Sequence, residues 1–263
     1  MTVLEIDAEL SYEVTADTSF AFSVCAAQTA GQKVLSESVE ITPDVEVERV
    51  PSVRGTQQLI RLEASPGELH LAYRATVAID TLADDPMVPA ELAFASIPPE
   101  VLPYLNPSRY CESDKLGDFA WRHFGATEPG YGRVSRISSW VGESILYTPG
   151  STDASSSATD VLLQRAGVCR DYAHVAITLC RALGVPARYV SGYALGLEPQ
   201  DFHGFFEAYL GGNWYLFDPT GMTLPNGVVR IRWGRDAADA PFATLVGRAD
   251  LVDMSVVVKV AEP

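Results

Sequence analysis

The first eighty residues alternate between apolar and polar side chains, which is the pattern of half-buried β-strands. The clearest strand runs over residues 70–79, and its apolar face consists of Leu71, Tyr73, Ala75, Val77 and Ile79. Residues 59–63 repeat the pattern over a shorter stretch, and prolines and glycines between positions 43 and 67 mark turns. Since these strands carry no cluster of reactive side chains, we expect a small antiparallel sandwich or open sheet that serves as a scaffold.

A linker and several short helices follow this β-rich region. Six prolines between positions 86 and 107 indicate a linker that begins near residue 80. Helical spacing of apolar residues then predicts helices over residues 113–124, 137–146 and 160–165. A polar loop precedes the third of these helices, which Ser157 or Thr159 can cap and Gly167 can end.

The most apolar helix of the chain is predicted to run from Cys169 to residue 183, before Gly184 and Pro186 end it. It is apolar almost all round, which is typical of a buried helix. Cys169 lies at its N-terminus, where free amide groups and the helix dipole stabilise a thiolate. Asp171 acts against that charge, although it suits the start of a helix. We interpret the other three cysteines as small buried side chains: Cys25, Cys111 and Cys180.

Two alternating strands around a pair of glycines predict a β-hairpin over residues 203–218. If Gly211 and Gly212 form the turn, Leu210 pairs with Asn213, and the residue numbers of every later pair also add up to 423. Asp218 therefore lies opposite Phe205. The carboxylate then shares a sheet face with His203 and lies one diagonal step away, within reach for the two side chains. A slip of one residue would place them on opposite faces.

Cys169, His203 and Asp218 together have the composition of a nucleophilic site. A cysteine nucleophile needs a base to take its proton and a third group to orient that base. A lone histidine on a strand is more often structural, but the pairing with a carboxylate and a cysteine at a helix start favours catalysis.

Two other polar residues near this site are interpreted as structural. His174 lies five residues after Cys169, about 140° round the helix, and therefore faces elsewhere. Glu207 shares the face of His203 but lies two pleats away, where we expect packing or hydrogen bonding. The cysteine spacing does not fit a zinc knuckle, and the sequence contains no phosphate-binding or dinucleotide-binding loop.

The composition restricts the possible partners. The chain has 263 residues, of which 47% are hydrophobic, so it can bury a large core as one domain or two. Its net charge of −15 argues against nucleic acid and anionic membranes as partners. No apolar run approaches the roughly 18 residues that span a bilayer, and residues 1–10 do not resemble a secretory leader. We therefore expect a cytoplasmic protein without a cofactor, although a chain whose leader has been removed would have the same sequence.

Several segments resemble the bacterial transglutaminase-like superfamily, in the right order along the chain. They are residues 167–174, 184–193, 202–209 and 214–219, with 107–111 and 234–239 similar to one bacterial subgroup. The resemblance implies a papain-like core and a triad of Cys169, His203 and Asp218 that forms a thioester from an amide. It also implies an oxyanion hole that contains the Cys169 N–H and an upstream aromatic side chain, for which Trp140 is our candidate.

The predicted fold is therefore of the α+β class. We expect an N-terminal antiparallel β-sandwich-like domain over residues 1–82. Residues 83–263 are expected to form the transglutaminase-like core, in which the cysteine helix packs on an antiparallel sheet and C-terminal strands follow.

The group that resolves the thioester decides the activity. Water makes the protein a peptidase or amidase that acts on peptides or proteins, whereas a lysine-like amine makes it a transglutaminase. We favour hydrolysis because the sequence does not indicate the calcium sites or accessory sandwiches of animal transglutaminases. A reaction like that of arylamine acetyltransferases would need a cofactor cleft that the sequence does not indicate. A non-enzymatic peptide-binding module would have no need of an intact triad.

Overall fold

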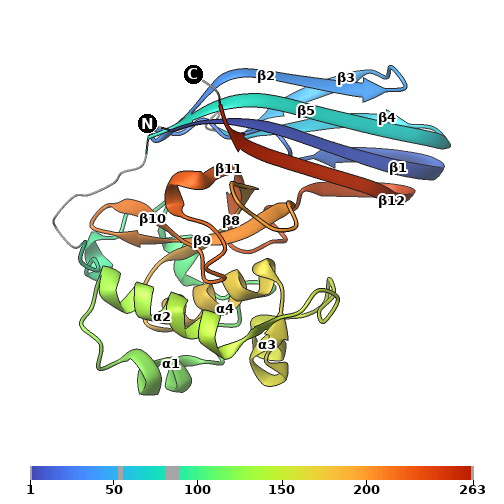
Figure 1. Ribbon diagram of the computed structural model, residues 1–263. Coiled ribbons are helices and arrows are strands. Elements are labelled where there is room, and N and C mark those ends of the chain that lie inside the picture. The colour runs from blue at the N-terminus through green and yellow to red at the C-terminus, as the bar shows by residue number, and fades with distance from the viewer. Residues whose placement is uncertain (1, 53–55, 81–88, 262–263) are drawn as a thin grey trace.

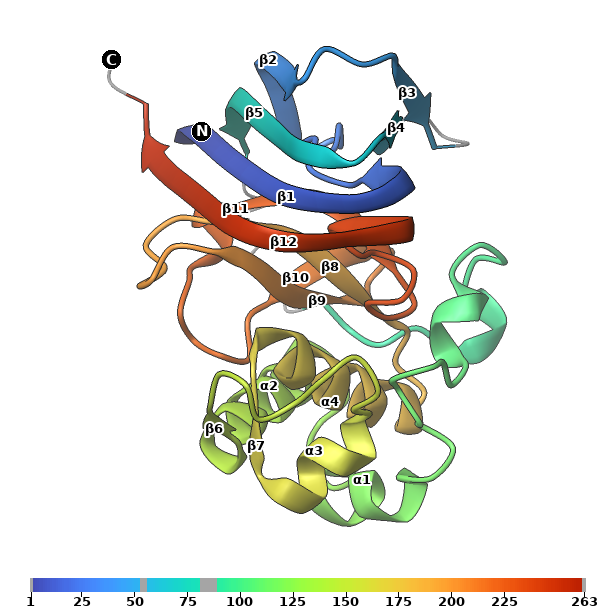
Figure 2. The ribbon, with the colours of Figure 1, turned by 90° about the vertical axis from the view of Figure 1, so that its right-hand side faces the viewer.

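The computed structural model describes residues 2–52, 56–80 and 89–261, and arranges them in three layers. A six-stranded sheet forms the first layer, a four-stranded sheet the second, and helices the third. Figures 1 and 2 show the four-stranded sheet between the other two layers. Sheets and helices are largely segregated along the chain, as the predicted α+β class requires.

The six-stranded sheet is built around one very long strand. It contains β1 (Thr2–Phe22), β2 (Gln32–Thr42), β3 (Val47–Pro51), β4 (Gln58–Ala64), β5 (Gly67–Ile79) and β12 (Ala243–Val260). One edge of β1 pairs with β5 over residues 2–14 and with β4 over residues 18–22, while β12 pairs along both stretches. The strand predicted over residues 70–79 lies within β5, and the apolar face expected for it is buried.

β12 joins the N-terminal sheet although it comes from the end of the chain. Its register places Val260 opposite Leu4 and Ala243 opposite Phe22. Val256 and other inward-facing side chains of β12 are buried in the core of this sheet. We had grouped this strand with the C-terminal half, because alternation along a strand does not reveal its partner. The domain boundary expected at residues 82–83 lies outside the described residues.

The four-stranded sheet carries the predicted hairpin. It contains β8 (Ala187–Ala194), β9 (Phe202–Leu210), β10 (Asn213–Phe217) and β11 (Val228–Gly234), in the order β10-β9-β8-β11. Leu210 pairs with Asn213 and Phe206 with Phe217, which is the predicted register. Every residue of β9 is buried, because the helices cover one side of this sheet and the six-stranded sheet the other.

The helical layer consists of four α-helices and shorter elements. Among the described residues these are α1 (Gly117–Phe124), α2 (Tyr131–Ser144), α3 (Ala158–Gln164), α4 (Cys169–Ala182), the 3-10 turns η1 (Phe94–Ser96) and η2 (Leu102–Leu105), and the two-residue strands β6 (Leu146–Tyr147) and β7 (Ala166–Gly167). A third 3-10 turn, η3 (Pro225–Gly227), contacts β1 instead. The central helix is α4, which is in contact with α1, α2, α3 and β9. Its buried residues form one core with the apolar residues that face it from the sheet, as its all-round apolar sequence predicts.

The ends of the shorter helices differ from the sequence predictions. α1 starts at residue 117 instead of 113, and α2 at residue 131 instead of 137. The apolar period of α2 extends back to Val134, which is fully buried. α3 starts at residue 158 instead of 160, and Ser157, one of the two caps predicted, caps it. It ends when Arg165 adopts a left-handed conformation with φ of 58°, and Gly167 instead forms β7.

Candidate active site

Cys169 is the first residue of α4, as the sequence predicts. Its position differs from that of the other cysteines, since Cys25, Cys111 and Cys180 are buried and Cys169 is partly exposed. The backbone amides of the first helical turn have no partner within the helix, and the helix dipole is positive at this end. The thiol therefore lies where the molecule both admits a reagent and favours a negative charge.

His203 and Asp218 come together as the hairpin register requires. His203 is the second residue of β9 and Asp218 directly follows β10, so each lies at the same end of the hairpin. The Nε2 atom of His203 lies 3.2 Å from Oδ2 of Asp218. Both side chains are almost completely buried. Because Nε2 faces the carboxylate, Nδ1 is the ring nitrogen left for the thiol of Cys169, whose sulfur interacts with this imidazole.

The loop after β10 holds Asp218 in place. Thr220 donates to Oδ1 of Asp218 from its backbone N–H (3.0 Å) and from its hydroxyl (2.7 Å). The backbone N–H of Thr223 donates to Oδ2 at 3.1 Å. The Thr220 hydroxyl also lies 3.4 Å from Nε2 of His203. We did not anticipate Thr220, because a threonine in a turn after a strand gives no signal of its contacts.

The electrostatic environment favours a protonated imidazole beside a charged carboxylate. Burial lowers the pKa of His203, but the hydrogen bond to Asp218 and the neighbouring Cys169 outweigh burial and raise it to about 9. Burial raises the pKa of Asp218, but its bonds with His203 and Thr220 bring the net pKa below the ordinary value. The arrangement is therefore suited to a thiolate–imidazolium pair.

The aromatic residue beside the thiol is Tyr147, not Trp140. Tyr147 belongs to β6, which pairs in parallel with β7 and so lies next to the start of α4. Its hydroxyl interacts with the backbone N–H and with the thiol of Cys169. Burial and the charge of Cys169 raise the pKa of Tyr147 to about 12, so the phenol stays a hydrogen-bond donor at neutral pH.

Trp140 lies in an aromatic cluster between α1 and α2. Its ring contacts Phe119, His123 and Phe124, with centroids 5.6, 5.8 and 5.7 Å away. The expectation that Trp140 is the upstream aromatic donor rests on a resemblance alone, and Trp140 lies closer to Cys169 in the sequence than that resemblance implies. A two-residue parallel bridge such as that of Tyr147 has no periodicity that a sequence can reveal.

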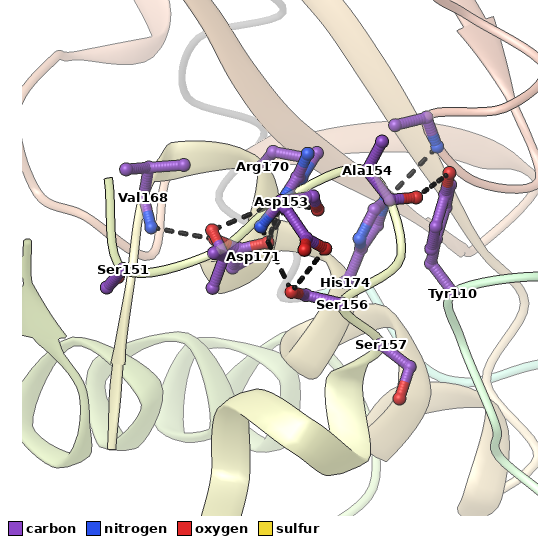
Figure 3. Close-up of polar contacts among 12 residues, drawn as sticks. Tyr110, Ser151, Asp153, Ala154, Ser156, Ser157, Val168, Arg170, Asp171 and His174 are labelled. Atoms are coloured by element: carbon purple, nitrogen blue, oxygen red, sulfur yellow. Dashed lines mark hydrogen bonds and ion pairs between the residues drawn. The ribbon is translucent and has the colours of Figure 1, made fainter. Parts of the chain in front are cut away.

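His174 has the structural environment that we expected. It is fully buried and stacks on Tyr110 at 5.1 Å, and its Nε2 accepts a hydrogen bond from the backbone N–H of Ala237 at 3.1 Å. Burial lowers the pKa of His174 to about 3, which keeps the ring neutral and able to accept that bond. Figure 3 shows His174 between Asp171 and Tyr110.

The described part of the chain offers neither a metal site nor a membrane-spanning helix. Among these residues, no group of three or more histidine, cysteine, aspartate or glutamate side chains is placed to hold a metal ion. None of the helices in the described ranges is long and apolar enough to cross a membrane.

Comparison with known proteins places both parts of the chain in related families. Residues 119–219 match the model of the transglutaminase-like superfamily, and residues 3–87 match the N-terminal domain of bacterial transglutaminases. A crystal structure from Cytophaga hutchinsonii, of a protein proposed to be a cysteine protease, is 40% identical. The match covers 100% of this chain and 91% of the other, with a TM-score of 0.94.

The curated relatives are longer than the region they share with this chain. An uncharacterized protein of Mycobacterium leprae is 34% identical over 134 residues, which cover 46% of this chain and 47% of the relative. An uncharacterized protein of Mycobacterium tuberculosis is 37% identical over 95 residues, or 36% of this chain and 29% of the relative. The chain thus matches less than half the length of these two relatives.

Proposed function

The chain belongs to the transglutaminase-like superfamily, and from that membership we propose that it catalyses thiol-dependent acyl transfer from amides, with water as the acceptor. One observation carries the proposal: His203 contacts Asp218 through Nε2 while its ring interacts with Cys169. This contact gives the imidazole the orientation and the charge that a cysteine nucleophile needs. The fold alone would be a weaker argument, since one fold serves many functions.

In the proposed reaction His203 carries one proton in the acylation half and a second proton in the hydrolysis half. It takes the proton of the Cys169 thiol, and the sulfur attacks the carbonyl carbon of the amide and forms a C–S bond. When the C–N bond breaks, His203 returns the proton to the leaving nitrogen, so that ammonia or an amine departs and a thioester remains. Water then loses a proton to His203 and its oxygen attacks the thioester carbonyl. The C–S bond breaks, the acid is released, and His203 returns the proton to the sulfur of Cys169.

The negative oxygen of the tetrahedral intermediate needs two donors. Tyr147 lies beside the start of α4, so its hydroxyl and the backbone N–H of Cys169 are neighbouring donors. A carbonyl oxygen that enters there can accept a hydrogen bond from each. We therefore assign to Tyr147 the part that the sequence analysis assigned to Trp140.

Tyr147→Phe is expected to lower kcat about a hundredfold with little change in KM, because the lost bond forms mainly in the transition state. The matched control is Tyr131→Phe, since Tyr131 is 36% exposed and Tyr147 37%. The measurement is steady-state kinetics on a peptide that the wild-type protein cleaves. A Tyr147→Phe variant with the kcat of the wild type would show that the hydroxyl does not hold the oxyanion.

Hydrolysis is the preferred outcome because the solved relative that spans this whole chain is one proposed to be a cysteine protease. Transfer to an amine is the second candidate, since the N-terminal region matches a domain of bacterial transglutaminases. Both outcomes use the same thioester, so the triad does not discriminate between them. The difference lies in which acceptor reaches the thioester first.

The two outcomes separate when the protein is incubated with dimethylcasein, with and without dansylcadaverine. We expect new peptides or free ammonia, no dansyl incorporation, and no reaction with Cys169→Ala. Dansyl incorporation that depends on Cys169 would identify a transamidase instead. If the wild-type protein binds casein peptides and leaves them intact in both assays, the proposal of an enzyme is wrong and the binding module is correct.

A further inference from the structure

The carboxylate of Asp171 is completely buried in the first turn of α4, two residues after Cys169. Its Oδ2 accepts hydrogen bonds from the backbone N–H of Val168 at 2.9 Å and from the hydroxyl of Thr152 at 2.5 Å. Its Oδ1 accepts two more from Nε and Nη2 of Arg170, at 3.0 and 2.9 Å. Four donors therefore surround one buried carboxylate at the start of the candidate nucleophile helix (Figure 3).

The bond from Val168 fixes the backbone that leads into Cys169. It satisfies an amide at the helix start that has no partner within the helix. Gly167 allows this close approach, because a Cβ atom there would lie 2.8 Å from Cβ of Asp171. Asp171 thus holds the backbone just before the nucleophile through the amide of Val168. The absence of a side chain at Gly167 is a requirement of that contact.

Arg170 links this helix start to the segment 148–157. Its Nη2 also donates to the hydroxyl of Thr152 at 3.2 Å and to the backbone carbonyl of Asp153 at 2.9 Å. A second contact holds the same segment, because the hydroxyl of Tyr110 donates to the backbone carbonyl of Ala154 at 2.8 Å. The guanidinium is therefore held in one place, and 26% of the Arg170 side chain is exposed.

A buried anion at this position creates a problem for catalysis. A like charge close to a thiolate opposes its formation, and the interior screens that repulsion poorly. Asp201 adds another acidic group near Tyr147 and His203. The ionisable side chains that interact with Cys169 itself include Tyr147, Tyr189 and His203. Of these three, His203 supplies a positive charge, and that charge is used in the proton transfer.

We propose that Arg170 is a positioning residue, which balances the charge of Asp171 so that Asp171 can hold the start of α4 without repelling the Cys169 thiolate. The pair has no net charge, and the helix N-terminus keeps its effect on the sulfur. This inference rests on the proposed function, because it concerns how the same thiol is kept reactive. Arg170 and Asp171 thus act as a pair, in which Asp171 holds the helix start and Arg170 balances its charge.

The test is the rate of Cys169 alkylation by iodoacetamide as a function of pH, with the modified residue identified by mass spectrometry. The other three cysteines are buried, so the signal comes from Cys169. Arg170→Gln is expected to lower the rate constant at pH 7 about tenfold and to move the midpoint of the profile to higher pH by about one unit. The double variant Arg170→Gln/Asp171→Asn, in which both charges are absent, is expected to regain the wild-type midpoint.

Two controls separate charge from folding. Arg170→Lys keeps the charge and should keep the midpoint, whereas Arg122→Gln removes the same charge from an exposed site on α1 and should have no effect. A wild-type midpoint in Arg170→Gln, or a double variant no better than the single one, would overturn the inference. The proposed function is tested separately, because it predicts that His203→Ala suppresses the alkylation of Cys169 whatever residue 170 is.

Discussion

His203→Ala is expected to lower kcat for amide hydrolysis by at least about a thousandfold. The reason is that one imidazole takes the proton of Cys169 and later gives it to the leaving nitrogen. No other histidine can replace it, because His174 faces away from the thiol and is neutral. The matched control is His123→Ala, which removes an exposed histidine from the last turn of α1 and should leave kcat unchanged.

The pH dependence distinguishes loss of catalysis from loss of structure. Because the pKa of His203 is raised to about 9, the ring is protonated below that pH and loses its proton above it. The leaving nitrogen needs this proton, so kcat is expected to fall about tenfold per pH unit above pH 9. Asp218→Asn removes the first of the interactions that raise the pKa, and should move the fall to lower pH. A profile unchanged by Asp218→Asn would contradict the assignment.

The same pKa has a consequence for stability. A folded-state pKa of about 9 lies above the ordinary value of 6.5, so protonated His203 stabilises the fold. This contribution is fully present below pH 6.5 and is lost as the pH rises through 9. Between pH 6 and pH 9.5, the free energy of unfolding measured with urea should therefore decrease more for the wild type than for His203→Ala.

The hairpin was predictable because short-range rules determine it. A two-glycine turn sets the register, and the register sets which side chains share a face. The contact between His203 and Asp218 follows from this arithmetic, without knowledge of the rest of the fold. The cysteine helix was predictable for a similar reason, since its apolar period and its N-terminal position are both local properties.

The contacts that the sequence did not reveal are those between segments without a period. Tyr147 reaches Cys169 through a two-residue parallel bridge, and β12 crosses the molecule to pair with β1. Both depend on the tertiary arrangement, which alternation and propensity do not encode. The end of α3 shows the same limit on a smaller scale, because Arg165 takes the left-handed conformation that sequence reasoning assigns to glycine.

A buried ion-pair cluster in the four-stranded sheet leads to the second large expected effect. Glu207 on β9 is 1% exposed and lies between two arginines. Its Oε2 accepts from Nε of Arg188 at 2.7 Å and its Oε1 from Nε of Arg230 at 2.6 Å. The guanidinium of Arg188 also stacks between Trp214 and Trp233, 4.1 and 4.6 Å from the ring centroids. The cluster joins β8, β9 and β11, and β9 carries His203.

Glu207→Gln is expected to lower the free energy of unfolding by about 3–5 kcal/mol at pH 7, because it leaves two largely buried arginines without a counter-charge. Glu48→Gln is the control: it breaks the pair with Arg61, whose partners are 58% and 60% exposed, and should cost at most about 1 kcal/mol. Urea unfolding of both variants and the wild type measures these differences. A loss within 1 kcal/mol for Glu207→Gln would mean that the cluster is not a source of stability.

The loss of stability caused by Glu207→Gln should also depend on pH. Burial raises the pKa of Glu207, but Arg188 and Arg230 outweigh it and lower the pKa to about 2, against an ordinary value of 4.5. A depressed folded-state pKa means that the stabilisation is complete above pH 4.5 and is lost as the pH falls towards 2. The difference between the wild type and Glu207→Gln should therefore shrink progressively below pH 4.5. If it stays constant down to pH 3, the stabilisation comes from packing and not from the charge of the carboxylate.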